Sequence, residues 1–215
     1  MKPIGKVKIK WSPEFAYAIG LLVTDGNLSP DRRHINFTSK DLELIRKFQK
    51  SLRINLHIGR KSSGSHAHKK YYVIQIGDVL FYRFLLDIGL IPRKTKIIGA
   101  IKIPAKYFFD FLRGHFDGDG TFYSYWYSRW RSSFMFYTVF VSASKDHIDW
   151  LRGVIFDFVN IKGHITKSVK NSIFQLKYAK AESLKLLPNL YYNKEVICLS
   201  RKRLKTEIAI KTNNK

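Results

Sequence analysis

The sequence predicts an α+β protein built from two tandem copies of one α-β-β-α-β-β-α unit, each with an antiparallel sheet. Three pairs of similar segments support this prediction, and they occur in the same order in both halves. The pairs are Gly-x4-Asp-Gly at residues 20–26 and 114–120, Ser-Lys-Asp at 39–41 and 144–146, and the apolar-Gln-apolar segments at 74–76 and 174–176. Because the order persists while the spacing drifts, we interpret the chain as a duplication whose loops have changed in length.

In the first half, residues 13–25 show helical spacing of apolar and small residues, and Ser12-Pro13 is typical of an N-cap and first helical position. Asp25-Gly26 is expected to end this helix, with Gly26 able to adopt the left-handed conformation. The remaining expected elements are a strand at 34–38, a helix capped by Ser39 or Asp41 and reaching about Arg53, and a hairpin around the loop 62–68. A third helix is expected at 79–90, preceded by Gly77-Asp78 and closed by Ile91-Pro92.

The second half repeats this order with a longer first hairpin. Its expected elements are a helix at 106–118, strands at 121–130 and 132–143, a helix at 146–158, a hairpin at 161–178 and a helix at 181–192. The sequence therefore predicts a first half-domain at 1–92, a linker at 93–105, a second half-domain at 106–192 and a basic C-terminal tail at 193–215.

The composition excludes several classes of protein. The 39 Lys and Arg residues against 16 Asp and Glu give a formal net charge of +23, which favours a polyanionic partner such as nucleic acid. The 16 Phe, 12 Tyr and 4 Trp indicate a folded core rather than a disordered basic chain. A single cysteine, Cys198, excludes a disulfide framework. Since neither a membrane-spanning run nor a secretory signal is visible, we expect an intracellular protein without a membrane partner.

The repeated motif indicates a specific use. Gly20 and Gly114 lie in the middle of predicted helices, where glycine costs about 1 kcal/mol relative to alanine, so we expect two helix backbones to approach closely there. Gly26 and Gly120 end the same motifs. If the helices pack together, their ends bring Asp25 and Asp119 close enough to bind a hard cation such as Mg²⁺. Two flanking sheets could then lie in the major groove of duplex DNA as a saddle, with cleavage across the minor groove.

Three phrases carry a resemblance to a known family: WSPEFAYAIGLLVTDGNL, IPAKYFFDFLRGHFDGDGTF and YYNKEVICLSRKRLK. Over residues 11–205 the chain resembles the LAGLIDADG homing endonucleases in their single-chain, two-motif form. The first motif departs from the family name at Val23 and Thr24, neither of which is the catalytic position. The resemblance implies the pseudo-two-fold LAGLIDADG fold and a monomeric, Mg²⁺-dependent endonuclease that cuts both strands of DNA at a long specific site, with Mn²⁺ as another usable cation.

The resemblance also implies site residues and a setting. Asp25 and Asp119 would bind the metal, and the carbonyl groups of Thr24 and Gly118 can ligate it. It further implies an intron-encoded or free-standing enzyme in a prokaryotic cytoplasm or nucleoid, or in an organelle matrix. A basic residue near the metals would assist the reaction, and we assign this role to Lys40 and Lys145, for which an exposed first-turn lysine is the other interpretation.

The neighbouring polar residues of the second motif, Arg113, His115 and Asp117, are interpreted as structural. Contacts to DNA are expected from polar side chains on the strands, through bidentate bonds to bases or through phosphate contacts. The candidates are Asn27, Arg32, Arg33, His34, Asn36, Arg60, Lys61, Lys69, Lys70, Gln75, Tyr123, Tyr125, Tyr127, Arg129, Arg131, Lys167, Lys170, Gln175 and Lys177.

Two other functions remain open from the sequence. One is a catalytically inactive DNA- or RNA-binding relative of the same fold, such as an intron maturase or a transcription regulator. Loss of a motif aspartate would favour this function, but both aspartates are present. A basic ribosomal or RNA-packaging protein explains the charge but leaves the repeated Gly-x4-Asp-Gly without a purpose.

Overall fold

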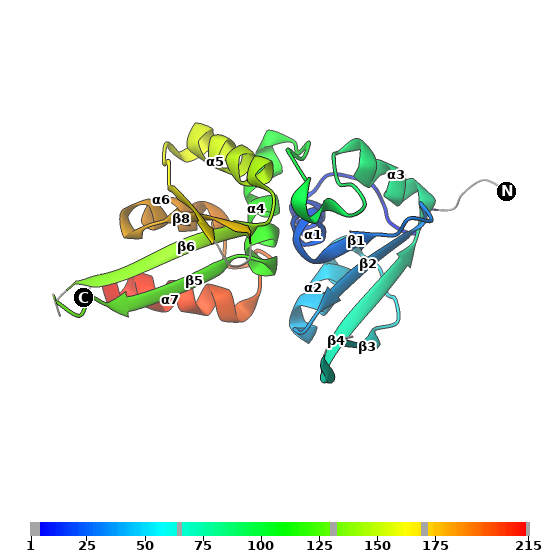
Figure 1. The fold of residues 1–215 in the computed structure, drawn as a ribbon, viewed down its shortest axis with the longest axis horizontal. Helices are drawn as coiled ribbons and strands as arrows, with labels where there is room; N and C mark the ends of the chain where they lie inside the picture. The colour runs from blue at the N-terminus through cyan, green and yellow to red at the C-terminus, as the bar shows by residue number, and fades with distance from the viewer. Residues whose placement is uncertain (1–4, 64–65, 130–132, 169–171, 214–215) are drawn as a thin grey trace. The chain divides into compact units, whose positions relative to one another are not determined.

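The computed structural model describes residues 5–63, 66–129, 133–168 and 172–213, with the backbone alone for 63 and 66–70. The elements follow the predicted order, with two four-stranded antiparallel sheets (Figure 1). Contacts divide the chain into a first unit, Met1–Lys94 with Ile101–Gly118, and a second unit, Thr95–Ala100 with Asp119–Lys215. This division differs from the one expected from the sequence, because the second motif helix groups with the first unit.

Helix α1 (Pro13–Asp25) opens the first unit as predicted, and the Ser12 hydroxyl accepts a hydrogen bond from the Phe15 amide at 3.1 Å. Its end differs from the expectation for Gly26. That residue is extended, with φ −82° and ψ 152°, and begins strand β1 (Gly26–Leu28) rather than adopting the left-handed conformation. Glycine is needed there for space, since a Cβ would lie 2.5 Å from the Leu22 carbonyl oxygen.

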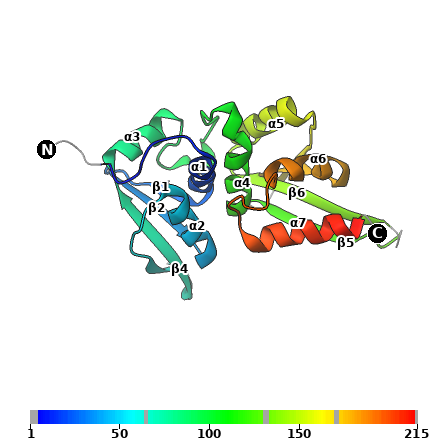
Figure 2. The same cartoon turned by 180° about the vertical axis from the view of Figure 1, so that it is seen from behind.

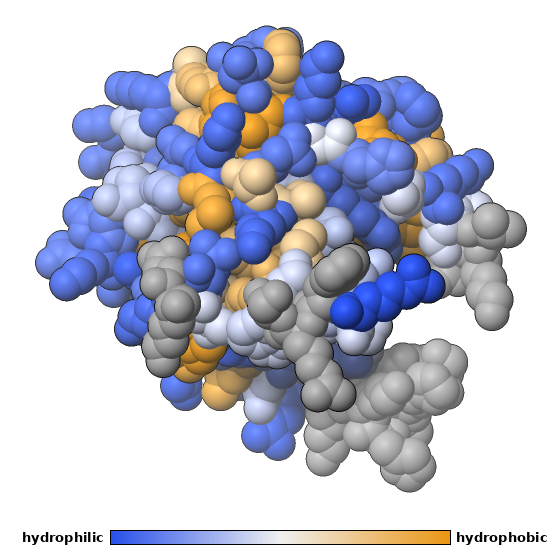
Figure 3. Space-filling view, turned by 90° about the vertical axis from the view of Figure 1, so that its left-hand side faces the viewer, coloured by the Kyte–Doolittle hydropathy of each residue, from blue (hydrophilic) through white to orange (hydrophobic). Residues whose placement is uncertain are grey.

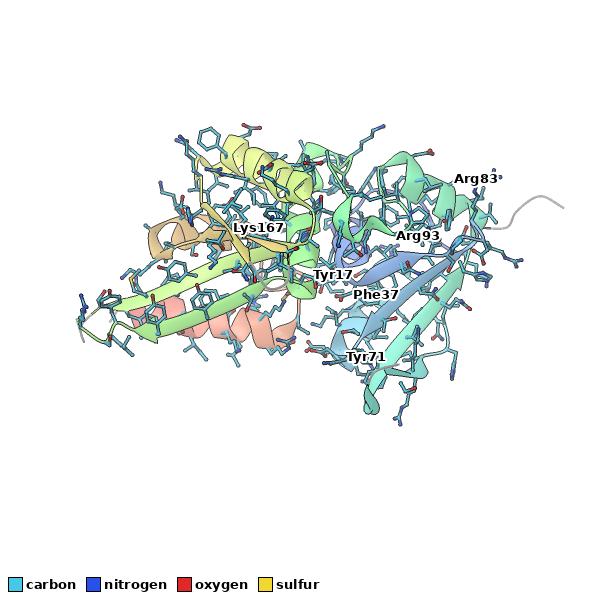
Figure 4. All side chains as sticks on the ribbon, in the orientation of Figure 1. Tyr17, Phe37, Tyr71, Arg83, Arg93 and Lys167 are labelled. Carbon is cyan, nitrogen blue, oxygen red and sulfur yellow. The ribbon has the colours of Figure 1, made fainter. Side chains whose placement is uncertain are left out.

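The first sheet has the strand order β1-β2-β4-β3, formed by β1, β2 (His34–Ser39), β3 (Gly59–Ser63) and β4 (His66–Gly77). Ile35, Phe37, Ile74 and Ile76 alternate along β2 and β4 and are fully buried on one face. Figure 4 labels Phe37, which stacks on Phe48 of helix α2 (Leu42–Leu52) with ring centroids 4.3 Å apart. The sheet is therefore covered by helices on one face only.

Aspartate side chains begin the two further helices of this unit. Asp41, one of the two residues predicted for this role, caps α2 (Leu42–Leu52) by accepting from the Glu43 amide, and Asp78 caps α3 (Val79–Asp87) by accepting from the Phe81 amide. Such caps satisfy backbone donors that have no partner in the first turn of a helix.

Helix α4 (Phe108–Gly118), preceded by the 3-10 turns η1 (Lys94–Lys96) and η2 (Ala105–Tyr107), packs directly on α1. The predicted close approach occurs at the two glycines. A Cβ on Gly20 would lie 2.1 Å from the Phe111 carbonyl oxygen, and a Cβ on Gly114 would lie 2.1 Å from that of Tyr17. No other residue type fits at either position without separating the helices.

The second unit contains the sheet β5-β6-β8-β7, built from β5 (Thr121–Trp126), β6 (Phe134–Ser142), β7 (His164–Ser168) and β8 (Ile173–Tyr178). Helices α5 (Lys145–Val159) and α6 (Lys180–Leu190) cover one face, on which Phe136, Phe140 and Leu176 are fully buried. The arrangement within this unit repeats that of the first sheet.

The segment expected as a basic tail is a helix, α7 (Ser200–Asn213), which lies along β5 and β6 (Figure 2). Lys202, Thr206 and Ala209 form its buried side, and Cys198 just before it is buried as expected. Because its apolar residues are few, helical periodicity gave too weak a signal to predict this element.

The surface agrees with the composition. The face shown in Figure 3 is mostly hydrophilic, with hydrophobic side chains in small patches between polar ones. Within the described ranges, no helix combines the length and the apolar character that crossing a bilayer requires.

Candidate nucleic-acid interface and motif-helix ends

A buried polar cluster fixes the contact between α1 and α4. The Tyr17 hydroxyl donates to the Asp117 carboxylate at 2.8 Å, and Arg113 forms an ion pair with Asp110 at 2.7 Å. Asp110 and Asp117 are 3% and 1% exposed, so both buried carboxylates need these partners. Asp117 thus lies against Tyr17, inside the helix contact, which agrees with its structural interpretation.

The carboxyl ends of the two motif helices lie together within the first unit. A Cβ on Gly118, the last residue of α4, would lie 2.0 Å from the Thr24 hydroxyl oxygen and 3.0 Å from the Asp25 carboxylate. Asp25 is half-buried, and Asp119, the residue after Gly118, is exposed. Glycine at 118 therefore leaves room for the Asp25 carboxylate at the point where α4 ends.

A lysine from a distant part of the chain contacts the end of α1. The Lys94 ammonium donates to the carbonyl oxygen of Gly26 at 2.5 Å and to that of Thr24 at 3.1 Å, and Lys94 is 9% exposed. Helix α1 has no basic residue in its last turn. Lys94 therefore supplies the cation that the negative end of the helix dipole favours, next to Asp25.

The second unit repeats this contact at the second motif. The Lys202 ammonium donates to the Gly120 carbonyl oxygen at 2.6 Å, and Lys202 is 6% exposed. Gly120 and Gly26 occupy the same position in the two motifs. Neither lysine was among the candidates from the sequence, although each follows the last α-helix of its repeat, in PRKTK and in SRKRL.

The two lysines assigned a catalytic role from the sequence, Lys40 and Lys145, have contacts of their own. Lys40 is exposed, and its ammonium lies 5.2 Å from the centroid of the Tyr71 ring. Lys145 is exposed at the start of α5 and pairs with Asp149 of the same helix. Both lysines are thus exposed to solvent, as the interpretation as first-turn lysines also expects. Lys94 and Lys202, by contrast, are buried and contact the motif ends.

Amide side chains form a row across the uncovered face of the first sheet. Asn27 pairs with Asn36, and Asn36 pairs with Gln75, in the registers of β1 with β2 and β2 with β4. Each alternates with buried residues on its strand, so all three point away from the helices. We call these three residues the amide row. Lys61 and Tyr71, which are register partners, lie on the same face.

A short hydrogen bond between a histidine and an aspartate stabilises the turn between β1 and β2. His34 Nδ1 lies 2.5 Å from the Asp31 carboxylate, which also accepts from the Arg33 and His34 amides at 3.0 Å. These hydrogen bonds, the one with the His34 side chain above all, lower the pKa of Asp31 to about 2. The turn is thus stabilised while Arg32 and Arg33 remain exposed.

The uncovered face of the second sheet carries tyrosines instead. Tyr123 and Tyr137 are register partners with ring centroids 5.2 Å apart, and Tyr125 lies 6.4 Å from Tyr137, with interplanar angles of 19° and 6°. We call these three residues the tyrosine ladder. Because the rings cover one another's faces, the ladder presents edges and hydroxyls, which suits hydrogen bonding better than base stacking.

The rest of this face is more varied. Lys177 pairs with Val139 and with His164, and Gln175 pairs with Val141 and with Thr166. His164 and Thr166 were not among the sequence candidates, although their alternation with Ile165 was a usable signal. Tyr127 and Arg129 follow β5 and are exposed.

Two candidates lie on the helix-covered side of their sheets rather than on the uncovered face. Arg60 pairs with Tyr72, and its guanidinium lies 5.9 Å from that ring. Lys167, labelled in Figure 4, pairs with Phe174, and its ammonium lies 5.4 Å from that ring. Charge alone did not reveal this, because the face of a residue depends on strand register. Outside the described parts lie Arg131, Lys170 and the side chains of Lys69 and Lys70.

Residues 12–89 match the family model described as LAGLIDADG-like domain. This match covers the first motif, both hairpins of the first sheet and α3. No curated protein sequence matches the chain.

Solved structures extend the similarity of fold to nearly the whole chain. The I-LtrWI LAGLIDADG homing endonuclease bound to target DNA has a TM-score of 0.61 at 10% identity, with 94% of this chain and 91% of that chain covered. The homing endonuclease I-DmoI in complex with DNA and Ca has a TM-score of 0.59 at 9% identity, covering 91% and 97%. The N-terminal LAGLIDADG domain of DUF199/WhiA has a TM-score of 0.55 at 18% identity, covering 86% and 85%. The resemblance predicted from the motifs is confirmed, and the fold is that of the LAGLIDADG homing endonucleases.

Proposed function

We propose that this protein is a site-specific endonuclease that cleaves both strands of duplex DNA with the aid of a divalent cation held by Asp25 and Asp119. The observation that carries the proposal is the contact of the two motif-helix ends, where Gly118 lies against Thr24 and Asp25. The solved structures of the same fold that contain DNA, one of them with Ca, support the choice of substrate and cofactor class.

The residues at the motif ends fit a hard cation. Glycine at 118 leaves room for the Asp25 carboxylate, and carboxylate oxygens are the ligands that Mg²⁺ prefers. Across the described residues, no three His, Cys, Asp or Glu side chains cluster as a larger metal site. This suits a cation that retains water and binds through one or two carboxylates plus substrate phosphate. When bound, such a cation lowers the pKa of water and stabilises charge on the leaving oxygen.

The protein's own residues position the reaction. We assign to Lys94 and Lys202 the basic role that the sequence analysis gave to Lys40 and Lys145. Their buried ammonium groups hold the carbonyl groups beside the motif aspartates, and their charge offsets that of a phosphate brought to the same place. Because Lys94 uses one lone pair of the Thr24 carbonyl, the other remains for a cation. The uncovered faces of the two sheets contact the bases and backbone of the duplex.

The experiment begins with a randomised duplex library, because it must first identify the DNA sequence that the protein cleaves. The wild-type protein is incubated with the library in Mg²⁺, in Ca²⁺ and in chelator, and all ends are sequenced. We expect paired breaks at a shared sequence in Mg²⁺ and none in chelator. Enrichment of one sequence by binding, without breaks in any metal, would contradict nuclease activity and favour a DNA-binding regulator. Enrichment of RNA alone would favour a maturase.

A further inference from the structure

A basic groove lies at one end of the first unit, outside the motif ends and the sheet face. Its volume is about 710 Å³, and its walls come from the β1–β2 turn, from α3 and from the segment after α3. Arg32, Arg83 and Arg93 supply its charge, with Val79, Leu86 and Pro92 between them. Figure 4 labels Arg83 and Arg93 in the part of the unit around α3.

The three guanidinium groups are available to a ligand. All three arginines are exposed, and in the described part of the chain no carboxylate lies within ion-pair distance of them. Asp31, the acidic neighbour of Arg32, is held by His34. The net charge of the whole chain is +23, so the groove concentrates a charge that already favours polyanions.

Two of these arginines have a costly backbone conformation. Arg32 has φ 57° and Arg93 has φ 53°, in the left-handed region where glycine or asparagine is the less strained choice. Such a conformation costs on the order of 1 kcal/mol for other residues. Arg53, the C-cap of α2, has the same conformation outside the groove, so the argument for the groove rests on the convergence of three exposed arginines rather than on their backbone.

We propose that this groove binds the phosphodiester backbone of duplex DNA beyond the segment that the first sheet contacts. The inference rests on the proposed function, since it extends the same DNA contact. Guanidinium groups form bidentate bonds with phosphate oxygens, and Val79 and Leu86 offer apolar surface to deoxyribose. The β1–β2 turn connects the groove to the amide row, because Asn27 and Asn36 lie on the two strands that the turn joins.

The test measures the salt dependence of binding to a mixed-sequence DNA duplex. Each protein–phosphate contact contributes a slope of about −0.9 to log Kobs against log[salt]. We therefore expect the Arg83→Gln/Arg93→Asn variant to reduce the slope by about 1.8, with asparagine chosen because it tolerates positive φ. The matched control is Arg46→Gln, an exposed arginine of α2 outside the groove, which should change the slope by much less. Hydroxyl-radical footprinting should show protection shortened at one end only.

The outcomes separate this inference from the proposed function. An unchanged slope and footprint in the double variant, with duplex binding retained, would overturn the groove assignment and leave the nuclease proposal intact. The assignment would also be overturned if Arg46→Gln changed the slope by as much per removed charge as the double variant does. The effect would then reflect the general positive charge of the protein rather than the groove. A loss confined to an RNA hairpin probe would assign the groove to RNA instead. Absence of duplex binding by the wild-type protein would contradict the proposed function itself.

Discussion

The uncovered face of the first sheet presents Asn27, Asn36 and Gln75 in one row, whereas the second sheet has Thr121, Val139 and Lys177 at the same positions. The two rows correspond because each begins one residue after the glycine that follows a motif aspartate. Amides form bidentate bonds with adenine, while a threonine methyl group contacts thymine and lysine contacts guanine or phosphate. Val139 is only 1% exposed, so the middle of the second row offers no contact surface. The two sheets therefore offer different chemistry to DNA.

The motif ends, by contrast, agree. Each has an aspartate before a glycine, and in each a buried lysine donates to that glycine's carbonyl oxygen, at 2.5 Å from Lys94 and at 2.6 Å from Lys202. The repeats have kept the residues that we assign to the reaction and changed those that we assign to recognition. The comparison predicts one reaction centre and a target with two dissimilar halves.

The largest effect should come from the glycines that bring the motif helices together. Gly20→Ala or Gly114→Ala places a methyl group 2.1 Å from a carbonyl oxygen, so we expect destabilisation by about 3 kcal/mol. Chemical denaturation measures this change. Gly153→Ala in α5 is the control, because its Cβ meets nothing within 4 Å and the change should stabilise the protein by about 0.5–1 kcal/mol. Similar losses at all three positions would contradict the close approach.

The next largest effect concerns the lysines that make the two motif ends alike. Lys94→Met and Lys202→Met keep much of the side-chain volume but remove the charge and the donated hydrogen bonds. We expect each to lower the cleavage rate by at least about 10²-fold on the library-selected duplex, with binding weakened far less. Lys40→Met and Lys145→Met serve as matched controls. A larger rate loss in the controls would return the catalytic role to Lys40 and Lys145.

A third prediction concerns the residues that differ between the two sheets. Replacing Asn27, Asn36 and Gln75 by Thr, Val and Lys gives the first sheet the row of the second. We expect the selected consensus to change in one half-site only, with a loss of adenine preference of about 1–3 kcal/mol per affected base pair. Selection from the randomised library and sequencing measure this. Arg60→Gln, on the helix-covered side, should leave the consensus unchanged, and a consensus change there would refute the face assignments.

The smallest effect concerns protonation of the tyrosine ladder. The hydrogen bond with Tyr137 and burial raise the pKa of Tyr125, and burial raises the pKa of Tyr123. Raised values mean that these phenols stay neutral above pH 10, where an ordinary tyrosine is half ionised. Subtracting the absorbance titration of Tyr125→Phe from that of the wild type isolates the ionisation of Tyr125. The midpoint of this difference curve should therefore lie above pH 10. Tyr137→Phe should move the Tyr125 midpoint down, and a midpoint unaffected by this change would contradict the hydrogen-bonded ladder.

Much of this fold was predictable from local signals. Ser12, Asp41 and Asp78 cap the helices whose starts were predicted at these positions. The burial of Ile35 and Phe37 follows from the alternation of apolar and polar residues along the strand. The paired glycines predicted the helix contact. A glycine in the middle of a helix is destabilising, and its presence in both motif helices indicates that both need space for a close backbone approach.

Other features depended on distant parts of the chain. Lys94 and Lys202 reach carbonyl groups 68 and 82 residues away, a relation that no local pattern carries. The faces of Arg60 and Lys167 depend on register across β3–β4 and β7–β8, which charge does not reveal. Gly26 was expected to be left-handed, yet it is extended because the need at that position is space beside Leu22.

The most direct test of the account compares Asp25→Asn and Asp119→Asn with the wild type on the library-selected duplex in Mg²⁺. Asp87→Asn, an exposed aspartate of α3, is the control for the loss of one carboxylate. We predict that each motif variant binds the duplex within a few-fold of the wild type while double-strand cleavage falls by at least about 10²-fold, and that the control retains activity. Undiminished cleavage by either motif variant would contradict the assignment of the reaction to the paired motif ends.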